Sequence, residues 1–258
     1  MFEPIFEIEI IPALSDNYIY IAHDAGGGAT AVVDPAEAGP VIAALERRGL
    51  ELTHILNTHH HFDHIGGNAE LVECYGVPVI GPRADSARIP GLDIEVGEGD
   101  SCTVGRETAR VFDVPGHTSG HIAFWFEKSR ALFCGDTLFA LGCGRMFEGT
   151  PELFWSSLGK LRTLPNETRV YCGHEYTQSN ARFALSLDPD NEALKAACQR
   201  VDDLRARGER TVPSELGEEK LANPFLRVDD PDLQRLVGME GAAPEAVFAE
   251  IRRRKDSF

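Results

Sequence analysis

The stretch Thr58–Gly67, which reads THHHFDHIGG, constrains the fold of this chain more than any other feature. It contains four side chains that can donate a lone pair to a metal ion, namely His59, His61, Asp63 and His64. His59 and His61 are two positions apart, which places them on one side of an extended segment. Asp63 and His64 are adjacent and point differently, so they could serve a second ion. The preceding apolar pair Ile55-Leu56 predicts a strand that leads into a metal-binding loop.

Three further ligand-type residues lie at predicted strand ends, each beside a glycine: His117 in VPGHTSGH, Asp136 in LFCGDTLF and His174 in VYCGHEY. Each follows an apolar run that would carry it to the rim of a sheet, and glycine lets the backbone approach an ion closely. One such residue alone would be better explained as a cap or a turn residue. Three of them, in a chain that also contains HxHxDH, predict a metal site.

These ligands divide into two sets and one shared residue. The first set is His59, His61 and His117, the second is Asp63, His64 and His174, and the shared residue is Asp136. Because a carboxylate has two oxygens, the shared residue can bridge two ions, and each ion then has four protein ligands. Nitrogen and oxygen ligands without sulfur suit zinc first, and iron and manganese also fit. The sequence therefore predicts two divalent metal ions.

The remaining histidines have weaker interpretations. His60 alternates away from its neighbours, so we expect it to support the ligands or to pack beside them. His54 and His121 lie within strand patterns and are expected to be structural. His23 lies at a turn and is expected to be exposed.

Composition narrows the class of protein. With 258 residues, 43% of them hydrophobic and 26% charged, the chain can bury a full core. Its net charge of −16 argues against nucleic acid as a partner, and any anionic substrate needs a local basic patch. The six cysteines form no CxxC pair, which predicts reduced thiols, several of them buried. No apolar run approaches a membrane span, and Met1–Pro4 lacks the start of a secretion signal, so we expect a cytoplasmic protein.

Hydrophobic patterns predict an α/β protein with two parts. Strands are expected at 6–11, 17–22, 30–33, 53–57, 77–80, 92–96, 101–104, 109–114, 121–126, 131–134 and 169–172. Helices are expected at 41–48, 69–75, 151–164, 178–187, 192–207, 231–237 and 244–255. Because helical patterns dominate after His174, we divide the chain into a catalytic domain, 1–176, and a helical domain, 177–258.

The motifs THHHFDHIGG, PGHTSGH, GDTLF and CGHEY resemble those of the metallo-β-lactamase superfamily. That resemblance implies an αββα sandwich with two metals at one edge. Nearly end to end, the chain is similar to the hydroxyacylglutathione hydrolase (glyoxalase II) family, through IPALSDNYIY, GCGRMFEGTPE, ANPFLR and RRRKDSF. This implies a smaller helical C-terminal domain and hydrolysis of S-D-lactoylglutathione to glutathione and D-lactate, the second step of methylglyoxal detoxification. We expect a monomer whose partner is this small-molecule thioester.

The family resemblance also implies substrate contacts, which are Arg145, Phe147, Tyr176, Arg252 and Lys255. The family often has Lys at the first of these positions and Tyr at the second. Arginine keeps the charge but presents a planar fork, whereas Phe147 lacks a hydroxyl and could contribute only a backbone contact. From composition alone, the cations near the C-terminus could equally be a solvated helix end, where they favour the helix dipole.

The expected mechanism assigns catalytic roles to Asp63 and Asp136. Two ions lower the pKa of a shared water to about 7, and we expect Asp63 to orient its oxygen towards the thioester carbonyl. A cysteine-type thiol has a pKa of about 8.5, so the thiolate leaves without a strong general acid. Cys134 and Cys143 flank the ligands in sequence, but neither has a base that is not committed to metal, which disfavours a thiol nucleophile.

Three other functions compete with this hypothesis. A glutathione persulfide dioxygenase of the same superfamily would need only one iron, and the complete second ligand set argues against it. β-Lactam hydrolysis is disfavoured because such enzymes place Cys or Ser differently in the second site. A non-catalytic metal-binding scaffold would be expected to lack at least one ligand, and none is missing.

Overall fold

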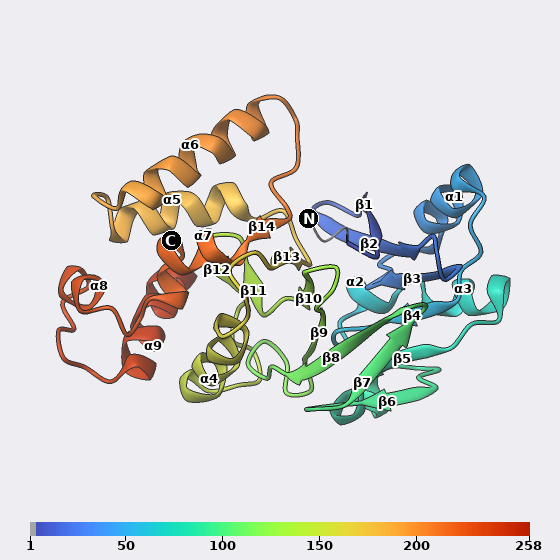
Figure 1. Ribbon diagram of the computed structural model, residues 1–258. Helices are drawn as coiled ribbons and strands as arrows, with labels where there is room; N and C mark the ends of the chain where they lie inside the picture. Colours follow the sequence, from blue (N-terminus) through green and yellow to red (C-terminus); the bar gives the residue numbers. More distant parts are fainter. Residues whose placement is uncertain (1–3) are drawn as a thin grey trace. The chain divides into compact units, whose positions relative to one another are not determined.

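The computed structural model describes residues 4–258, and these residues form two compact units (Figure 1). The first unit comprises the residues up to Asp113 together with Ser119–Gly135. The second comprises Val114–Thr118 and Asp136–Phe258. None of the helices among the described residues is long and apolar enough to cross a membrane.

The first unit contains a six-stranded sheet whose strands follow one another in sequence order. These strands are β1 (Glu7–Ala13), β2 (Asn17–Asp24), β3 (Ala29–Val33), β4 (His54–Leu56), β5 (Val79–Pro82) and β6 (Ile94–Val96). The first three pair antiparallel and the last four pair parallel. Parallel strands end at the same edge of a sheet, so the residues after β3 and β4 lie side by side. This edge carries the histidine stretch.

One face of this sheet is covered by α1 (Ala38–Arg48) and α3 (Asn68–Tyr75), with the short α2 (Phe62–Ile65) between them in sequence. Apolar residues of the strands, such as Ile21 and Ile55, pack there with Leu45 of α1 and Leu71 of α3 in one buried cluster. The unit also contains the 3₁₀ helix η1 (Arg83–Arg88).

A second, antiparallel layer in this unit has the strand order β10-β9-β8-β7. Its strands are β7 (Ser101–Val104), β8 (Glu107–Asp113), β9 (Ile122–Phe126) and β10 (Ala131–Gly135). The two sheets pack through aromatic rings, since Tyr20 of β2 lies 5.5 Å from Phe133 of β10. Two stacked sheets with helices outside confirm the predicted α/β class.

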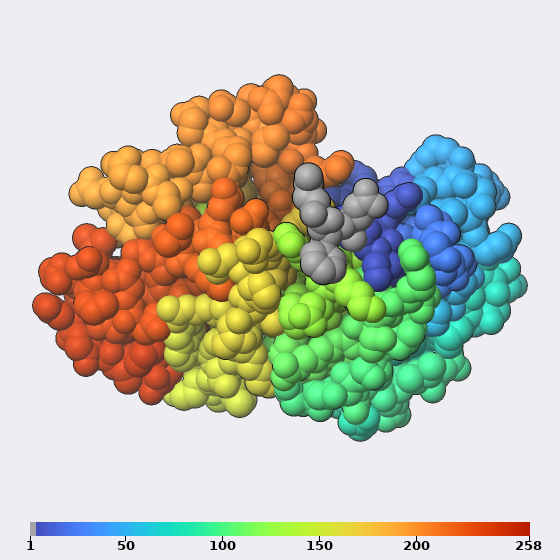
Figure 2. Space-filling view, in the orientation of Figure 1, coloured from blue at the N-terminus to red at the C-terminus, as the bar shows by residue number. Residues whose placement is uncertain are grey.

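The second unit is mainly helical. It contains the hairpin β11 (Leu138–Phe139) and β12 (Gly142–Cys143), and the pair β13 (Arg169–Cys172) and β14 (Ser214–Glu215). Its helices are α4 (Pro151–Arg162), α5 (Thr177–Leu187), α6 (Glu192–Ala206), α7 (Leu216–Ala222), η2 (Pro224–Leu226), α8 (Pro231–Leu236) and α9 (Pro244–Asp256). Helices α5 and α6 run side by side, and the C-terminal segments form the orange and red surface of Figure 2.

Several details differ from the sequence-based expectation, among them the following three. His23 is buried rather than exposed, because β2 continues through it and its Nδ1 lies 3.0 Å from Thr30 Oγ1 on β3. Strand β1 continues through Pro12, which the sheet tolerates because β1 is an edge strand. Helix α7 was not predicted, since its short sequence LGEEKLA has a helix-disfavouring glycine at the second position.

Candidate metal centre

In the first unit, Asp34 organises the start of the histidine stretch. It follows β3 directly, and its carboxylate accepts from the backbone N–H and the hydroxyl of Thr58 at 2.8 and 2.7 Å. Asp34 has φ 49, a backbone conformation that is rare for a residue other than glycine. The parallel pairing of β3 with β4 therefore ties the segment that carries the ligands to a buried carboxylate.

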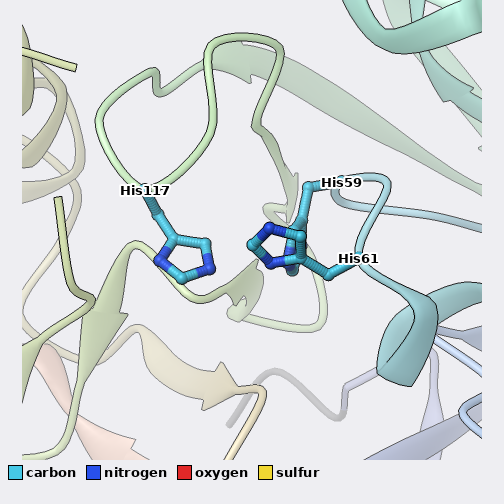
Figure 3. Close-up of side chains that lie close together, drawn as sticks. All are labelled: His59, His61 and His117. Atoms are coloured by element: carbon cyan, nitrogen blue, oxygen red, sulfur yellow. The ribbon is translucent and has the colours of Figure 1, made fainter. Parts of the chain in front are cut away.

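The proton positions on His59 follow from its neighbours. Because the Thr58 hydroxyl donates to Asp34, its oxygen accepts from His59 Nδ1 at 3.0 Å, which leaves a lone pair on His59 Nε2. That nitrogen lies 3.1 Å from His61 Nδ1. His59 is fully buried and its ring stacks on His121 with centroids 4.5 Å apart. Figure 3 shows the side chains of His59 and His61 on the segment that follows β4.

Asp63 and His64 form a second pair of donors in this unit. Asn17 Nδ2 donates to Asp63 Oδ2 at 2.9 Å and to its backbone oxygen at 3.1 Å. Since a carboxylate only accepts, His64 Nδ1 donates to Asp34 at 3.0 Å and His64 Nε2 carries the lone pair. This nitrogen lies 3.6 Å from Asp63 Oδ2.

In the second unit, α4 positions the loop that carries His117. Ser157 donates to the carbonyl oxygen of Pro115 at 2.7 Å, and a Cβ on Gly116 would lie 2.4 Å from the Phe154 ring, so only glycine fits. His117 Nδ1 donates to the carbonyl oxygen of Arg145 at 2.8 Å. The lone pair of His117 is therefore on Nε2, the arrangement that metal-binding histidines usually have.

Asp136 lies between two histidines of the second unit. Its Oδ2 is 3.4 Å from His117 Nε2 and 3.3 Å from His174 Nε2. All three residues are buried. The His174 ring stacks face to face on Tyr176, with centroids 4.7 Å apart, which fixes its plane. One carboxylate oxygen placed beside two imidazole nitrogens is the arrangement that a bridging ligand requires.

The donor spacings test whether these residues fit a metal ion. Ligand atoms about 2.1 Å from a tetrahedral ion are about 3.4 Å apart. The four spacings within the units, 3.1, 3.6, 3.4 and 3.3 Å, all lie close to this value. Asp34 also lies within 4.8 Å of donor atoms of His59 and His64. Since its oxygens already accept from Thr58 and His64, we interpret Asp34 as a residue that orients ligands, which the sequence analysis missed.

The other histidines have structural contacts. His60 Nδ1 lies 2.9 Å from the buried Asp85, which also pairs with Arg88. His54 Nδ1 lies 2.8 Å from the Thr53 hydroxyl. All six cysteines of the chain lie in the described part as free thiols, and all but Cys74 are buried. Burial raises the pKa of Cys143 to about 11, so this thiol is a poor nucleophile at neutral pH.

The residues expected to bind substrate all belong to the second unit. Phe147 is 60% exposed, with its ring 5.2 Å from that of His117, and Tyr176 is half-exposed beside His174. Arg145 is exposed. Lys255 Nζ lies 3.3 Å from both oxygens of Ser179, and burial lowers its pKa to about 8.

Arg252 differs from the other candidate substrate contacts because it is buried, with 4% of its surface exposed. Its Nη1 donates to the carbonyl oxygens of Cys143 and Gly144 at 3.0 and 3.3 Å, and its Nη2 pairs with Asp256 at 2.9 Å. This side chain therefore holds the segment that leads to Arg145, a contact that no sequence pattern indicated.

Comparison with known protein families agrees with this geometry. Residues 12–174 match the model of the metallo-beta-lactamase superfamily, and residues 175–258 match that of the hydroxyacylglutathione hydrolase C-terminus. The fold is similar to BLEG-1 B3 metallo-beta-lactamase, with 25% identity, a TM-score of 0.65, and coverage of 85% of this chain and 99% of that one. It is also similar to TTHA1623 in a di-iron-bound form, with 28% identity, a TM-score of 0.60, and coverage of 84% and 98%.

These matches define a protein with the metallo-β-lactamase fold. Curated relatives named hydroxyacylglutathione hydrolase are much more similar in sequence: that of Methylococcus capsulatus is 57% identical and that of Rhodospirillum rubrum 56%, each over 98% of both chains. The chain belongs to the hydroxyacylglutathione hydrolase family. The motifs thus predicted both the superfamily and the family correctly, and the histidine and aspartate clusters suit the binuclear divalent metal site of such proteins.

Proposed function

We propose that this protein is a metal-dependent thioester hydrolase that cleaves S-(2-hydroxyacyl)glutathione to glutathione and a 2-hydroxy acid. The preferred substrate on this proposal is S-D-lactoylglutathione and the acid is D-lactate. Relatives that are 52–57% identical over nearly the whole chain carry the name of this activity. The observation that carries the proposal is that the possible metal-binding atoms within each unit are spaced near 3.4 Å. In addition, His59, His64 and His117 each carry the ring proton on Nδ1, which leaves Nε2 to face the proposed metal.

The proposed metal centre contains two divalent ions, with zinc as the first candidate. His59, His61 and His117 would hold one ion. Asp63, His64 and His174 would hold the other, and Asp136 would be a ligand of both. Each unit supports this assignment by itself. In the first unit, the two ligands assigned to each ion lie near one another. In the second unit, Asp136 Oδ2 lies beside two histidines that are assigned to different ions.

The bound ions would supply Lewis acidity and lower the pKa of a water molecule to about 7. The protein's own contribution is to fix the proton positions and orientations around them. His59, His64 and His117 each donate Nδ1–H to a fixed acceptor, so Nε2 of each ring is the nitrogen available to a metal. Asn17 holds Asp63 so that one carboxylate oxygen can orient the attacking water. The departing thiol, with a pKa of about 8.5, needs no strong general acid.

Substrate binding is proposed to use Arg145, Phe147, Tyr176, Arg252 and Lys255. Glutathione conjugates are net anionic, and the chain has a net charge of −16, so local cations are needed to attract them. Exposed Phe147 and half-exposed Tyr176 lie against the rings of His117 and His174. Both side chains could therefore contact a thioester near the proposed metal centre. The buried Arg252 would act mainly by holding the segment before Arg145.

The remaining assignments also stay proposals. We propose a catalytic domain at 1–176 and a substrate-binding helical domain at 177–258, a monomeric state and a cytoplasmic location.

The test is an assay of the purified protein with S-D-lactoylglutathione, following loss of the thioester absorbance. We expect hydrolysis that stops when a chelator removes the metals and returns when zinc is added. A lactam and a lactone serve as control substrates. Glutathione persulfide is a third control, for which an oxygen electrode measures the consumption of oxygen. Oxygen consumption without thioester cleavage would identify a persulfide dioxygenase instead, and no reaction with a metal-loaded protein would indicate a binding scaffold.

A further inference from the structure

The hairpin β11–β12 lies between two parts of the proposed site in the second unit. Asp136 precedes it and Arg145 follows it, and the Arg145 carbonyl oxygen receives the Nδ1 proton of His117. Gly144, at the returning end, has no room for a side chain. A Cβ there would lie 1.9 Å from the Asp136 carbonyl oxygen and 3.3 Å from His117 Nδ1. A shift of this hairpin would therefore move both proposed ligands.

The turn of the hairpin carries a strained residue. Leu141 has φ 56, a left-handed conformation that is unfavourable for a leucine. Its side chain is buried in a cluster with residues of α5, α6 and α7, among them Ala184, Leu194 and Ala222. The hairpin thus inserts an apolar side chain into the helical core, and the surrounding contacts must hold the unusual backbone.

Besides Arg252, which binds the carbonyl oxygen of Cys143, three buried polar side chains of the helical part bind the backbone of this hairpin. Glu219 of α7 accepts from Leu141 N–H at 2.8 Å. Asn223 Nδ2 donates to the carbonyl oxygens of Gly142 and Phe139 at 2.9 and 3.2 Å, and to Glu219 at 3.0 Å. Asn180 of α5 donates to Ala140 at 3.1 Å. All three side chains are buried, with at most 4% exposure.

We infer that Asn180, Glu219 and Asn223 are positioning residues that set Asp136 and His117 for metal binding by fixing the β11–β12 hairpin. This inference rests on the proposed metal centre. Backbone oxygens and N–H groups buried at a turn need partners, and here the partners come from α5, α7 and the residue after α7 rather than from the neighbouring strand. The helical region would thereby contribute to the metal centre as well as to substrate binding.

The test compares Asn223→Ala with Asn191→Ala in the full-length, zinc-loaded protein. Asn191 also lies in the second unit and caps α6 by accepting from Leu194 N–H at 3.0 Å, but it does not touch the hairpin. Both variants should lower the midpoint of thermal unfolding. Only Asn223→Ala should weaken zinc binding, by about tenfold to a hundredfold in competition with a chelator, as loss of a group that orients ligands does.

Hydrogen exchange gives a second readout that is independent of metal and activity. In the metal-free protein, Asn223→Ala should speed exchange of the Leu141 amide, whereas Asn191→Ala should not. Glu219→Gln is the conservative variant, because burial raises the pKa of Glu219 to about 7 and the side chain is partly protonated at neutral pH. Its amide oxygen can still accept from Leu141, so zinc affinity should stay within about threefold of the parent.

Equal zinc affinity in Asn223→Ala and the parent would overturn the inference, as would equal loss in Asn191→Ala. A failure of the proposed function looks different, because the parent protein itself would then bind no zinc pair or cleave no thioester. Should Asn223→Ala not fold, Asn180→Ala takes its place in the comparison with Asn191→Ala. It removes a single contact to Ala140 and should also weaken zinc binding, whereas Asn191→Ala should not.

Discussion

Replacing Asp136 with alanine is expected to lower kcat by about a thousandfold and to leave at most one firmly bound ion. The reason is that Asp136 Oδ2 lies beside His117 and His174, which we assign to different ions. Removing it takes one donor from each ion and leaves the two cations without a shared negative charge. Metal-ion catalysis contributes several kcal/mol, and about 4 kcal/mol corresponds to a thousandfold. Metal content by plasma emission and steady-state kinetics would measure both effects.

A matched control for this substitution is Asp188→Ala. Asp188 is also a buried aspartate of the second unit, where it pairs with Arg227 at 2.6 Å. Its loss should destabilise the fold without changing metal content. Full activity and two ions in Asp136→Ala would contradict the assignment, and so would an equal loss of metal in Asp188→Ala.

Replacing Asp34 with asparagine is expected to weaken metal binding by about tenfold to a hundredfold, although Asp34 is not a proposed ligand. Its carboxylate accepts from Thr58 N–H, the Thr58 hydroxyl and His64 Nδ1. An amide offers only one acceptor oxygen, so one of these donors would face an NH₂ group. The orientation of His64 and, through Thr58, of His59 would be lost. Zinc affinity measured by chelator competition reports the change.

Asp24→Asn is the control for that experiment. Asp24 is another fully buried aspartate of the first unit, and its hydrogen bonds and ion pair with Arg106 hold the pKa of its carboxyl well below the usual range. The substitution should lower the unfolding temperature and leave zinc affinity unchanged. If Asp34→Asn bound zinc as tightly as the parent, Asp34 would have only a structural role.

The places of the proposed ligands near strand ends were predictable, because local sequence determines where a strand ends. His59 and His61 follow β4 within a few residues, Asp136 follows β10 directly, and His174 lies two residues after β13. An apolar run followed by glycine and a ligand residue therefore indicates a sheet edge. The family resemblance rests on the same motifs, and the comparisons confirm it.

The residues that orient the ligands were not predictable in the same way. Asn17 and Asp34 are far from His64 in sequence, and only the pairing of β2, β3 and β4 brings them together. One sequence feature did point to Asp34: it is an acidic residue directly after a predicted strand. If that strand is parallel to β4, its end lies beside Thr58. Strand order, however, cannot be read from a single pattern.

Burial of charged residues was also beyond the sequence pattern. Arg252 lies in the basic run RRRK, which indicates an exposed helix end, yet its guanidinium binds the carbonyl oxygens of Cys143 and Gly144. Glu219 lies in the charged segment LGEEKLA and is nevertheless buried against Leu141. In both cases the buried charged side chain forms hydrogen bonds with the backbone at or beside the β11–β12 hairpin, which offset the free-energy cost of burying it. The hairpin is distant in sequence, so only the structure reveals these partners.

The most direct test of the account is a crystal structure of the zinc-loaded protein with anomalous data at the zinc edge. We expect two ions, one bound by His59, His61 and His117 and the other by Asp63, His64 and His174, with Asp136 bound to both. A single ion, or two ions held by other residues, would contradict it.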